Sequence, residues 1–293
     1  MAADKSAFTF WRVCIIDDAS TDDSLQNIEN LDLPIQIIRN TTRRGYGASC
    51  NLGAKRSKAD YLLFLNTDTR LTFNSLSKPL LYMEQIENKQ VAIAGIKLLE
   101  DSDKVSRSCA RFPKVSTFFV TMFGLNRLFP SIFLSHQMKE WNHLNTREVD
   151  QVMGAFMLMR SSVFLKLGGY DERFFVYMED LDLSLRTRQL GLKSIYLSDS
   201  YAYHIGGGTS DKVKDESLFF NLRSRIQYGF KHFSLIGSVT LVVGTILIEP
   251  MTRLALGFLH RSIVEVKTTI QAYIKLWRWC LSLIHSGFLL QKD

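Results

Sequence analysis

The run Tyr61–Leu65 constrains the fold of this 293-residue sequence more than any other stretch. It is a continuous apolar segment bounded by polar residues, which is typical of a strand buried on both faces of a parallel sheet. Further β-rich runs at 13–16, 35–38 and 91–96 alternate with polar loops and stretches of helical character. This alternation predicts a doubly wound α/β sheet.

Polar residues follow two of these predicted strands. Asp17 and Asp18 follow the first strand, and Asn66-Thr67-Asp68 follows Tyr61–Leu65. Ligands of such sheets bind beyond the carboxyl ends of the strands. A carboxylate there can hold a divalent cation that bridges a diphosphate, and the first pair can bond a ribose or a base. The alternative is that these residues only begin turns, which Asp favours.

The second half of the chain is expected to add a strand at 151–160, a helix at 180–190, a strand at 194–197 and a basic, aromatic helix at 217–232. Glu179 and Asp180 open the first of these helices. Acidic residues there interact well with the helix dipole, and that is a sufficient structural reason for them. Asp180 can also face a cleft and act as a general base.

Two further features can bind ligands. His204 follows the strand at 194–197 and is either structural or a ligand of a metal shared with a carboxylate. The loop at 43–47 contains Arg44 and Gly45, so its backbone can approach a phosphate while arginine adds charge. The alternative for the loop is a solvated basic turn.

The composition changes at Phe233. Residues 233–248 are uncharged, which is short of the ~20 residues of a spanning helix. From Leu259 to Leu281, apolar residues recur at three- and four-residue steps with basic residues beside them, which predicts an amphipathic helix at a membrane surface. The alternative is a helix that packs on the rest of the chain or on a partner. We therefore predict a domain over 1–232 and a membrane-associating region over 233–293.

Composition also restricts the class of protein. The net charge of +7 suits an anionic partner, but the sequence has no stacking-aromatic or helix-turn-helix pattern, so nucleic acid is not expected. The four cysteines lack metal-ligand spacing, which indicates a reducing compartment. The first ten residues contain no apolar signal-peptide core.

The order of these motifs resembles family 2 glycosyltransferases, in particular the rhamnosyltransferase-like branch that acts in cell-wall or O-antigen assembly. The resemblance covers roughly residues 10–232. Its motifs, in chain order, are Asp17-Asp18-Ala19-Ser20-Thr21-Asp22, Asn40, Gly45-Tyr46-Gly47-Ala48, Asn51-Leu52-Gly53, Leu65-Asn66-Thr67-Asp68, Gly154-Ala155-Phe156-Met157, Gly168-Gly169-Tyr170-Asp171, Glu179-Asp180-Leu181-Asp182-Leu183, Arg186 and His204.

The resemblance implies the GT-A fold, a Rossmann-like, mostly parallel sheet flanked by helices. It also implies inverting transfer of a sugar, such as rhamnose, from a nucleotide-diphospho-sugar to a lipid-linked or polysaccharide acceptor at the cytoplasmic face of the membrane. It implies these roles: Asp17 and Asp18 at the nucleoside; Arg44, Gly45, Asn51 and Asn66 at the donor pocket; Asp68 and His204 on Mg²⁺ or Mn²⁺; Asp180 as base beside Glu179; Asp150 and Gly154 at the acceptor; Arg223 and Arg225 near the diphosphate.

The sequence departs from the family in two places. The resemblance begins near Phe10, in what corresponds to the family's second strand, so the first strand is expected to be missing. That loss would expose the edges of two neighbouring strands. Asn66 replaces the first Asp of the metal motif and removes one charge. The alternative function is therefore an inactive or weakly active, truncated glycosyltransferase-like subunit with a binding role. Self-association is left open.

Overall fold

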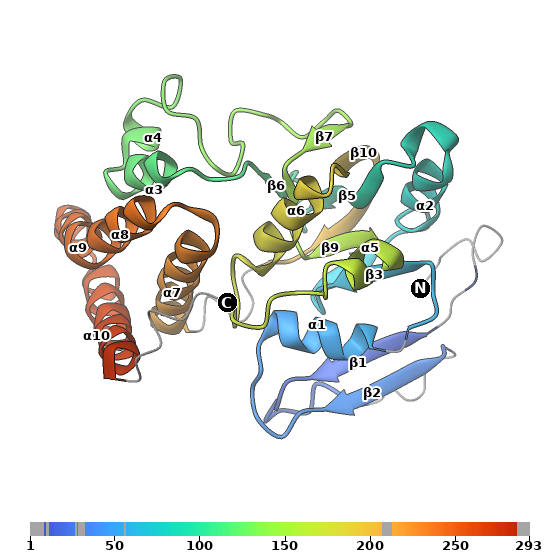
Figure 1. The fold of residues 1–293 in the computed structure, drawn as a ribbon, viewed down its shortest axis with the longest axis horizontal. Coiled ribbons are helices and arrows are strands. Elements are labelled where there is room, and N and C mark those ends of the chain that lie inside the picture. Colours follow the sequence, from blue (N-terminus) through green and yellow to red (C-terminus); the bar gives the residue numbers. More distant parts are fainter. Residues whose placement is uncertain are drawn as a thin grey trace. The chain divides into compact units, whose positions relative to one another are not determined.

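The computed structural model describes residues 9, 12–26, 28, 33–55, 57–206 and 213–285, without the side chains of the last two. The chain forms two compact units. Unit 1 comprises Met1–Phe112 and His136–Gly206, and unit 2 comprises Pro113–Ser135 and Gly207–Asp293. Figure 1 labels the elements of each unit.

A six-stranded mixed sheet forms the centre of unit 1. Strand β9 runs antiparallel between β3 and β5, β5 and β10 are parallel, and β4 and β7 are each antiparallel to β10. The α/β class is confirmed, and the sheet combines both strand directions. The strands are β3 (Tyr61–Leu65), β4 (Thr69–Leu71), β5 (Val91–Leu99), β7 (Arg147–Val149), β9 (Phe156–Arg160) and β10 (Lys193–His204).

Helices cover both faces of this sheet because its central strands are apolar on both sides. In β9, Met157 and Met159 pack in one core cluster, whereas Phe156 and Leu158 pack in another, as the two-residue period of a strand requires. The first cluster contains residues from α1 (Tyr46–Ala54), α5 (Ser161–Lys166) and α6 (Glu179–Gln189). The second contains residues of the segment that includes α2 (Ser77–Glu84).

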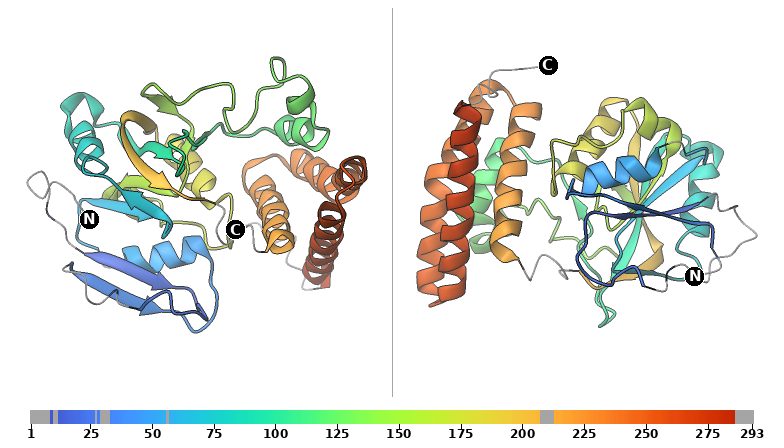
Figure 2. Two further views of the ribbon diagram at one scale, coloured as in Figure 1. Left: turned by 180° about the vertical axis from the view of Figure 1, so that it is seen from behind. Right: turned by 90° about the horizontal axis from the view of Figure 1, so that it is seen from below.

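Strands β1 (Val13–Asp17) and β2 (Ile35–Arg39) form a separate parallel pair. Helix α1 packs on β1, so that a Cβ on Gly53 would lie 3.5 Å from Ile16 (Figure 2). In the part of the chain that the structure describes, β1 pairs only with β2 and β3 only with β9. Each thus has one edge without a partner among the described strands.

The predicted strand at 151–160 is wrong in one respect, because the structure divides it. Strand β8 (Gln151–Val152) pairs with β6 (Cys109–Ala110), and β9 begins only at Phe156. Between them the backbone turns, with the amide of Phe156 donating to the carbonyl of Met153. The break lies in a continuously apolar run, so hydrophobic pattern alone does not reveal it.

Two predicted elements of unit 1 also change at their ends. Strand β10 is longer than the predicted 194–197 and has His204 as its last residue. Helix α6 begins at Glu179 and ends before Gly191, whose φ of 76° favours glycine. The N-terminal position of Glu179 and Asp180 on this helix is as expected.

Unit 2 is helical, and its division differs from the predicted boundary at 232. Helix α7 packs with α8 and α10, and α3 also packs with α8, so both 113–135 and the last helices lie in one unit. Its elements are α3 (Val115–Met122), α4 (Leu125–Leu128), α7 (Lys214–His232), α8 (Leu235–Val243), η3 (Gly244–Ile248), α9 (Glu249–Leu259) and α10 (Ile263–His285).

The residues of the apolar stripe predicted on α10 differ in exposure. Tyr273 is buried, with its neighbour Leu276, in a cluster with α7 residues, whereas Trp277 and Leu281 are about half exposed. Tyr273 of the predicted stripe therefore packs within unit 2, and the predicted contact of its exposed residues with a membrane stays a prediction.

Substituting Gly95 by Ala is expected to lower the free energy of unfolding by about 1–3 kcal/mol. An added Cβ would lie 2.7 Å from the Cβ of Val152, in a closely packed core. Because Val152→Ala removes Cγ1, which also lies 2.7 Å from the added Cβ, the double variant should be less destabilised than the two single variants summed. Urea unfolding of the four proteins measures this, and strictly additive losses would contradict the shared contact.

Candidate active site

The segment Gly154–Ala155, between β8 and β9, joins the parts of the candidate site. The amide of Gly154 donates to Asp180 Oδ2 at 3.1 Å, and the hydroxyl of Tyr46 donates to the Gly154 carbonyl at 2.9 Å. The amide of Asn66 donates to the Ala155 carbonyl at 3.1 Å. The start of α6 and the loop after β3 therefore meet at two adjacent residues.

Asp68 and His204 are in direct contact. Asp68 Oδ1 lies 3.2 Å from His204 Nε2, and Asn66 Nδ2 lies 3.5 Å from the same ring nitrogen. The antiparallel pairing of β4 with β10, in which His204 is opposite Thr69, brings these residues together. The side chains of Asp68 and His204 are 33% and 11% exposed, so the pair is sheltered and still reachable.

This pair fits a divalent cation shared with a substrate. Within the described residues, no group of three or more His, Cys, Asp or Glu side chains can hold a metal, so the protein would supply few ligands. Mg²⁺ and similar cations often bind in this way, with one or two carboxylates and the phosphates of a substrate. The carboxylate of Asp68 suits Mg²⁺ or Mn²⁺, and a neutral imidazole such as that of His204 can add a nitrogen ligand.

The environment of the pair Glu179 and Asp180 favours a different charge on each. Asp180 accepts hydrogen bonds from the amides of Gly154 and Leu181, which stabilise its ionised form. Glu179 is 6% exposed, and its Oε2 has no hydrogen-bond partner in the described structure. Burial, and then the charge of Asp180, raise the pKa of Glu179 well above its usual value. Burial also raises the pKa of Asp180, opposed by the bonds from Gly154 and Leu181.

It follows that a proton shared by this pair resides on Glu179, and Asp180 carries the negative charge. The position of Asp180 at the N-terminus of α6 also favours the ionised form. The geometry thus suits Asp180 for accepting a proton, and Glu179 for limiting the negative charge beside it.

Asp18 organises the loop on the donor side. Its carboxylate accepts hydrogen bonds from Asn40 Nδ2 and from the amides of Arg44 and Gly45, each at 2.8 Å. Gly45 has a φ of 91°, and a Cβ there would overlap the carbonyl of Phe175, so only glycine fits. Both oxygens of Asp18 therefore accept hydrogen bonds from the protein and hold this loop in place, and the predicted contact of Asp18 with the nucleoside stays a prediction.

Asp17 remains available at the end of β1. It is partly exposed and accepts a hydrogen bond from the amide of Ser20 at 2.9 Å. The hydrogen bonds with Ser20 lower the pKa of Asp17, so it is ionised at neutral pH.

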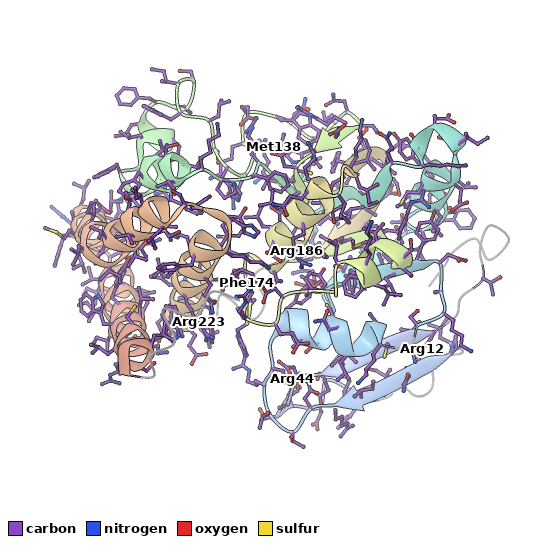
Figure 3. The ribbon with its side chains drawn as sticks, in the orientation of Figure 1. Arg12, Arg44, Met138, Phe174, Arg186 and Arg223 are labelled. Atoms are coloured by element: carbon purple, nitrogen blue, oxygen red, sulfur yellow. The ribbon has the colours of Figure 1, made fainter. Side chains whose placement is uncertain are left out.

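Glu172 belongs to this side of the site and was missed by the sequence analysis. Asn51 Nδ2 donates to the Tyr170 carbonyl at 2.9 Å and to Glu172 Oε1 at 3.0 Å. Arg44, labelled in Figure 3, forms an ion pair with Glu172 Oε2 at 3.0 Å. Its position in the sequence could have indicated this role, because Glu172 directly follows the motif Gly168-Gly169-Tyr170-Asp171.

The other predicted residues serve their own surroundings. Asp150 Oδ2 accepts from the amide of Phe112 at 2.9 Å and keeps its second oxygen 3.6 Å from Arg188. In unit 2, Arg225 is 6% exposed and paired with Glu249 at 2.5 Å. Because this buried pair already neutralises the charge of Arg225, we do not propose a contact between Arg225 and the diphosphate.

Arg223 lies on the same helix of unit 2 and is labelled in Figure 3. Its guanidinium carbon lies 5.5 Å from the centre of the Trp279 ring, a cation–π contact within unit 2. Burial lowers the pKa of Arg223. Its predicted contact with the donor diphosphate stays a prediction.

Comparison with known proteins identifies the family. The family described as "Glycosyl transferase family 2" matches residues 3–165, more than half of the sequence. This chain therefore belongs to glycosyl transferase family 2, as its motifs led us to expect.

Two relatives belong to the predicted branch. The rhamnosyltransferase WbbL of Escherichia coli K12 is 31% identical over 172 residues, which cover 58% of this chain and 61% of the relative. The N-acetylglucosaminyl-diphospho-decaprenol L-rhamnosyltransferase of Mycobacterium tuberculosis H37Rv is 41% identical over 58 residues, covering 20% and 19%. This chain thus spans about three-fifths of the first relative and a fifth of the second.

Solved structures with similar folds are more distant in sequence. The mannosyltransferase PcManGT from Pyrobaculum calidifontis, in complex with GDP-Man and Mn²⁺, is 12% identical, with a TM-score of 0.48 over 96% of this chain and 72% of that chain. GalNAc-T7 with UDP, GalNAc and Mn²⁺ is 16% identical, with a TM-score of 0.46 over 66% and 37%.

Glu179→Gln should change how stability depends on pH. Because the folded-state pKa of Glu179 is raised above its ordinary value of 4.5, its stabilising contribution is fully present below that value and is lost as pH rises through the folded pKa. The variant should therefore gain stability relative to the wild type between about pH 5 and about pH 8. Urea unfolding at both values measures the difference, and a constant difference would contradict a protonated Glu179.

Proposed function

We propose that this chain is an inverting, metal-dependent glycosyltransferase of the GT-A fold. It would transfer a sugar, rhamnose by analogy with the named relatives, from a nucleotide-diphospho-sugar to a lipid-linked or polysaccharide acceptor. The observation that carries the proposal is that the adjacent residues Gly154 and Ala155 bond both to Asp180 and to Asn66, which belongs to the same loop as Asp68 of the Asp68–His204 pair. Family membership and the names of the relatives support it.

On the donor side, Asp68 and His204 would hold Mg²⁺ or Mn²⁺, with Asn66 beside them. The bound cation would neutralise the diphosphate as it leaves the sugar. Since Asp18 already holds the amides of Arg44 and Gly45, the side chain of Arg44 is the group that remains for a phosphate. Its present partner, Glu172, is 45% exposed, and such a surface pair is weak enough to exchange.

Two further roles on the donor side are proposed from where the residues lie in the structure. Asp17 would bond the nucleoside, as predicted, because its carboxylate lies at the end of β1 and is partly exposed. Asn51 would act indirectly, since its amide holds Tyr170 and Glu172.

On the acceptor side, Asp180 would remove the proton from the attacking hydroxyl group while that oxygen bonds to the anomeric carbon. The bond to the diphosphate breaks on the opposite face, so the configuration inverts and no protein nucleophile is needed. Glu179 would stay neutral beside the base. Gly154 and Asp150 would border the acceptor, and a Cβ on Gly154 would lie 3.1 Å from the hydroxyl of Tyr46.

The place of action follows from the acceptor and from unit 2. A lipid-linked acceptor is confined to a membrane, and unit 2 contains a helix, 235–259, that is long and apolar enough to cross one by length and composition. We propose peripheral attachment at the cytoplasmic face, where nucleotide-sugars are made.

A binding subunit without turnover is the second candidate. The observation that favours it is the pair of unpaired edges on β1 and β3 within the described residues. Such edges lower the stability of a sheet and expose it to other chains.

A donor panel tests the two candidates. The protein is incubated with dTDP-, UDP- and GDP-sugars, Mg²⁺ or Mn²⁺, and membrane acceptors. The proposal expects metal-stimulated transfer or slow hydrolysis of one donor class, abolished by a chelator. Donor binding without any turnover would favour the binding subunit.

Asp180→Asn should lower the rate of transfer by about 10²–10⁴-fold, because it removes the base while keeping the shape of the side chain. Donor affinity, measured by calorimetry with metal present, should change little. Asp199→Asn is the matched control, because Asp199 is a surface residue paired with Lys78 and 65% exposed. Near-normal turnover of Asp180→Asn would contradict the proposed base.

A further inference from the structure

The helix 235–259 of unit 2 carries apolar side chains on its outer face. Its inner face is buried within the unit, at Ser238, Leu241, Thr245 and Glu249. The outer residues recur mostly at three- and four-residue steps, and all are exposed: Ile236 81%, Val239 48%, Val243 45%, Leu247 61%, Met251 71% and Phe258 69%. A surface helix normally turns a polar face outward, so this exposed stripe indicates a binding surface.

A second group of exposed apolar residues lies in the segment 113–135. Its members are Phe123, Leu128, Phe129, Ile132 and Leu134, which are 49–71% exposed. This segment is held against the helix 235–259, because a Cβ on Gly244 would lie 2.6 Å from the ring of Phe119. Figures 1 and 2 draw α3 and α4 beside α8.

The net charge of the protein is confined to unit 2. Unit 2 has thirteen Lys and Arg against six Asp and Glu, whereas unit 1 has twenty-three of each, so the whole net charge of +7 belongs to unit 2. Arg261, Lys267 and Arg278 of this unit are exposed. Apolar side chains together with excess positive charge match the surface of a membrane that contains anionic lipids. The same charge would oppose contact with a second copy.

The helix cannot cross the membrane without losing its contacts in unit 2. A third of its most apolar window, 33%, is buried inside the protein. Near its middle, Glu249 is 3% exposed and pairs with Arg225 and Arg253. A carboxylate at that depth would be costly in lipid. These buried contacts favour a helix that lies along a membrane over one that crosses it.

We propose that the outer stripe of 235–259 and the exposed residues of 113–135 form one docking surface, which rests in the plane of an anionic bilayer. The inference depends on the proposed function only because that function uses an acceptor held in a membrane. The residues of 113–135 were not part of the predicted membrane region, and they enter the proposed surface because they lie in the same unit as the helix 235–259.

Vesicle flotation of the full chain tests this surface. Wild-type protein is mixed with vesicles of phosphatidylcholine alone, or with about a third phosphatidylglycerol. Two variants alter the surface: Val239→Gln/Val243→Gln/Leu247→Gln, and Phe129→Ser/Ile132→Ser. The matched control, Leu81→Gln/Ile86→Gln/Leu165→Gln, alters equally exposed apolar residues of unit 1. Circular dichroism checks that each variant folds.

The proposal expects binding only to anionic vesicles, reversal by high salt or alkaline carbonate, and a loss of about tenfold or more in each surface variant but not in the control. Equal binding by all variants would overturn it. Resistance to carbonate would show a spanning helix and also overturn it. The proposal would also be overturned if the wild type does not bind vesicles and instead forms a concentration-dependent dimer that the surface variants abolish.

Sugar transfer is measured in parallel with a soluble acceptor. Surface variants should keep wild-type turnover there, because none alters a proposed catalytic residue. If no protein transfers sugar while vesicle binding behaves as expected, the proposed function fails and the docking surface stands.

Discussion

The hydrogen bond from the Gly154 amide to Asp180 is the contact on which the candidate site depends. It exists because the apolar run after β8 leaves the sheet for three residues before β9 begins. That turn exposes one amide to the start of α6 and one carbonyl to the loop after β3. A strand running unbroken through this point would have used both groups in its ladder, and the two halves of the site would have had no common support.

The same contact explains how two adjacent acids can differ in charge. Hydrogen bonds to Asp180 stabilise a negative charge on its carboxylate. Glu179 is buried and one of its oxygens has no partner in the described structure, which disfavours a second negative charge on Glu179. Around them, hydrogen bonds hold two predicted binding residues against the protein's own loops. Asp18 and Asn51 hold loops, so their contribution to binding would pass through Arg44, Gly45 and Glu172.

Much of unit 1 could be predicted because its signals are local. Tyr61–Leu65 and the run beginning at Val91 are apolar strands, and Gly191 ends a helix as its conformation requires. The contact of Asp68 with His204 was implied only by family resemblance, since it joins residues far apart in sequence. The break at Gly154, the role of Asp18 and the position of 113–135 in unit 2 depend on tertiary contacts that no periodicity encodes. Tyr273 shows the same limit, because a spacing rule cannot tell which side of a helix meets its neighbours.

The central claim is that a cation bound at Asp68 and His204 lies beside Asp180. Paramagnetic broadening of amide signals by Mn²⁺, in the presence of a nucleoside diphosphate and with Mg²⁺ as the diamagnetic reference, measures it most directly. The amides of Gly154, Ala155 and Leu181 should broaden strongly, and Asp68→Asn should abolish the effect. If Mn²⁺ binds with the nucleotide while these amides keep their full intensity, the parts of the site do not converge and the account is contradicted.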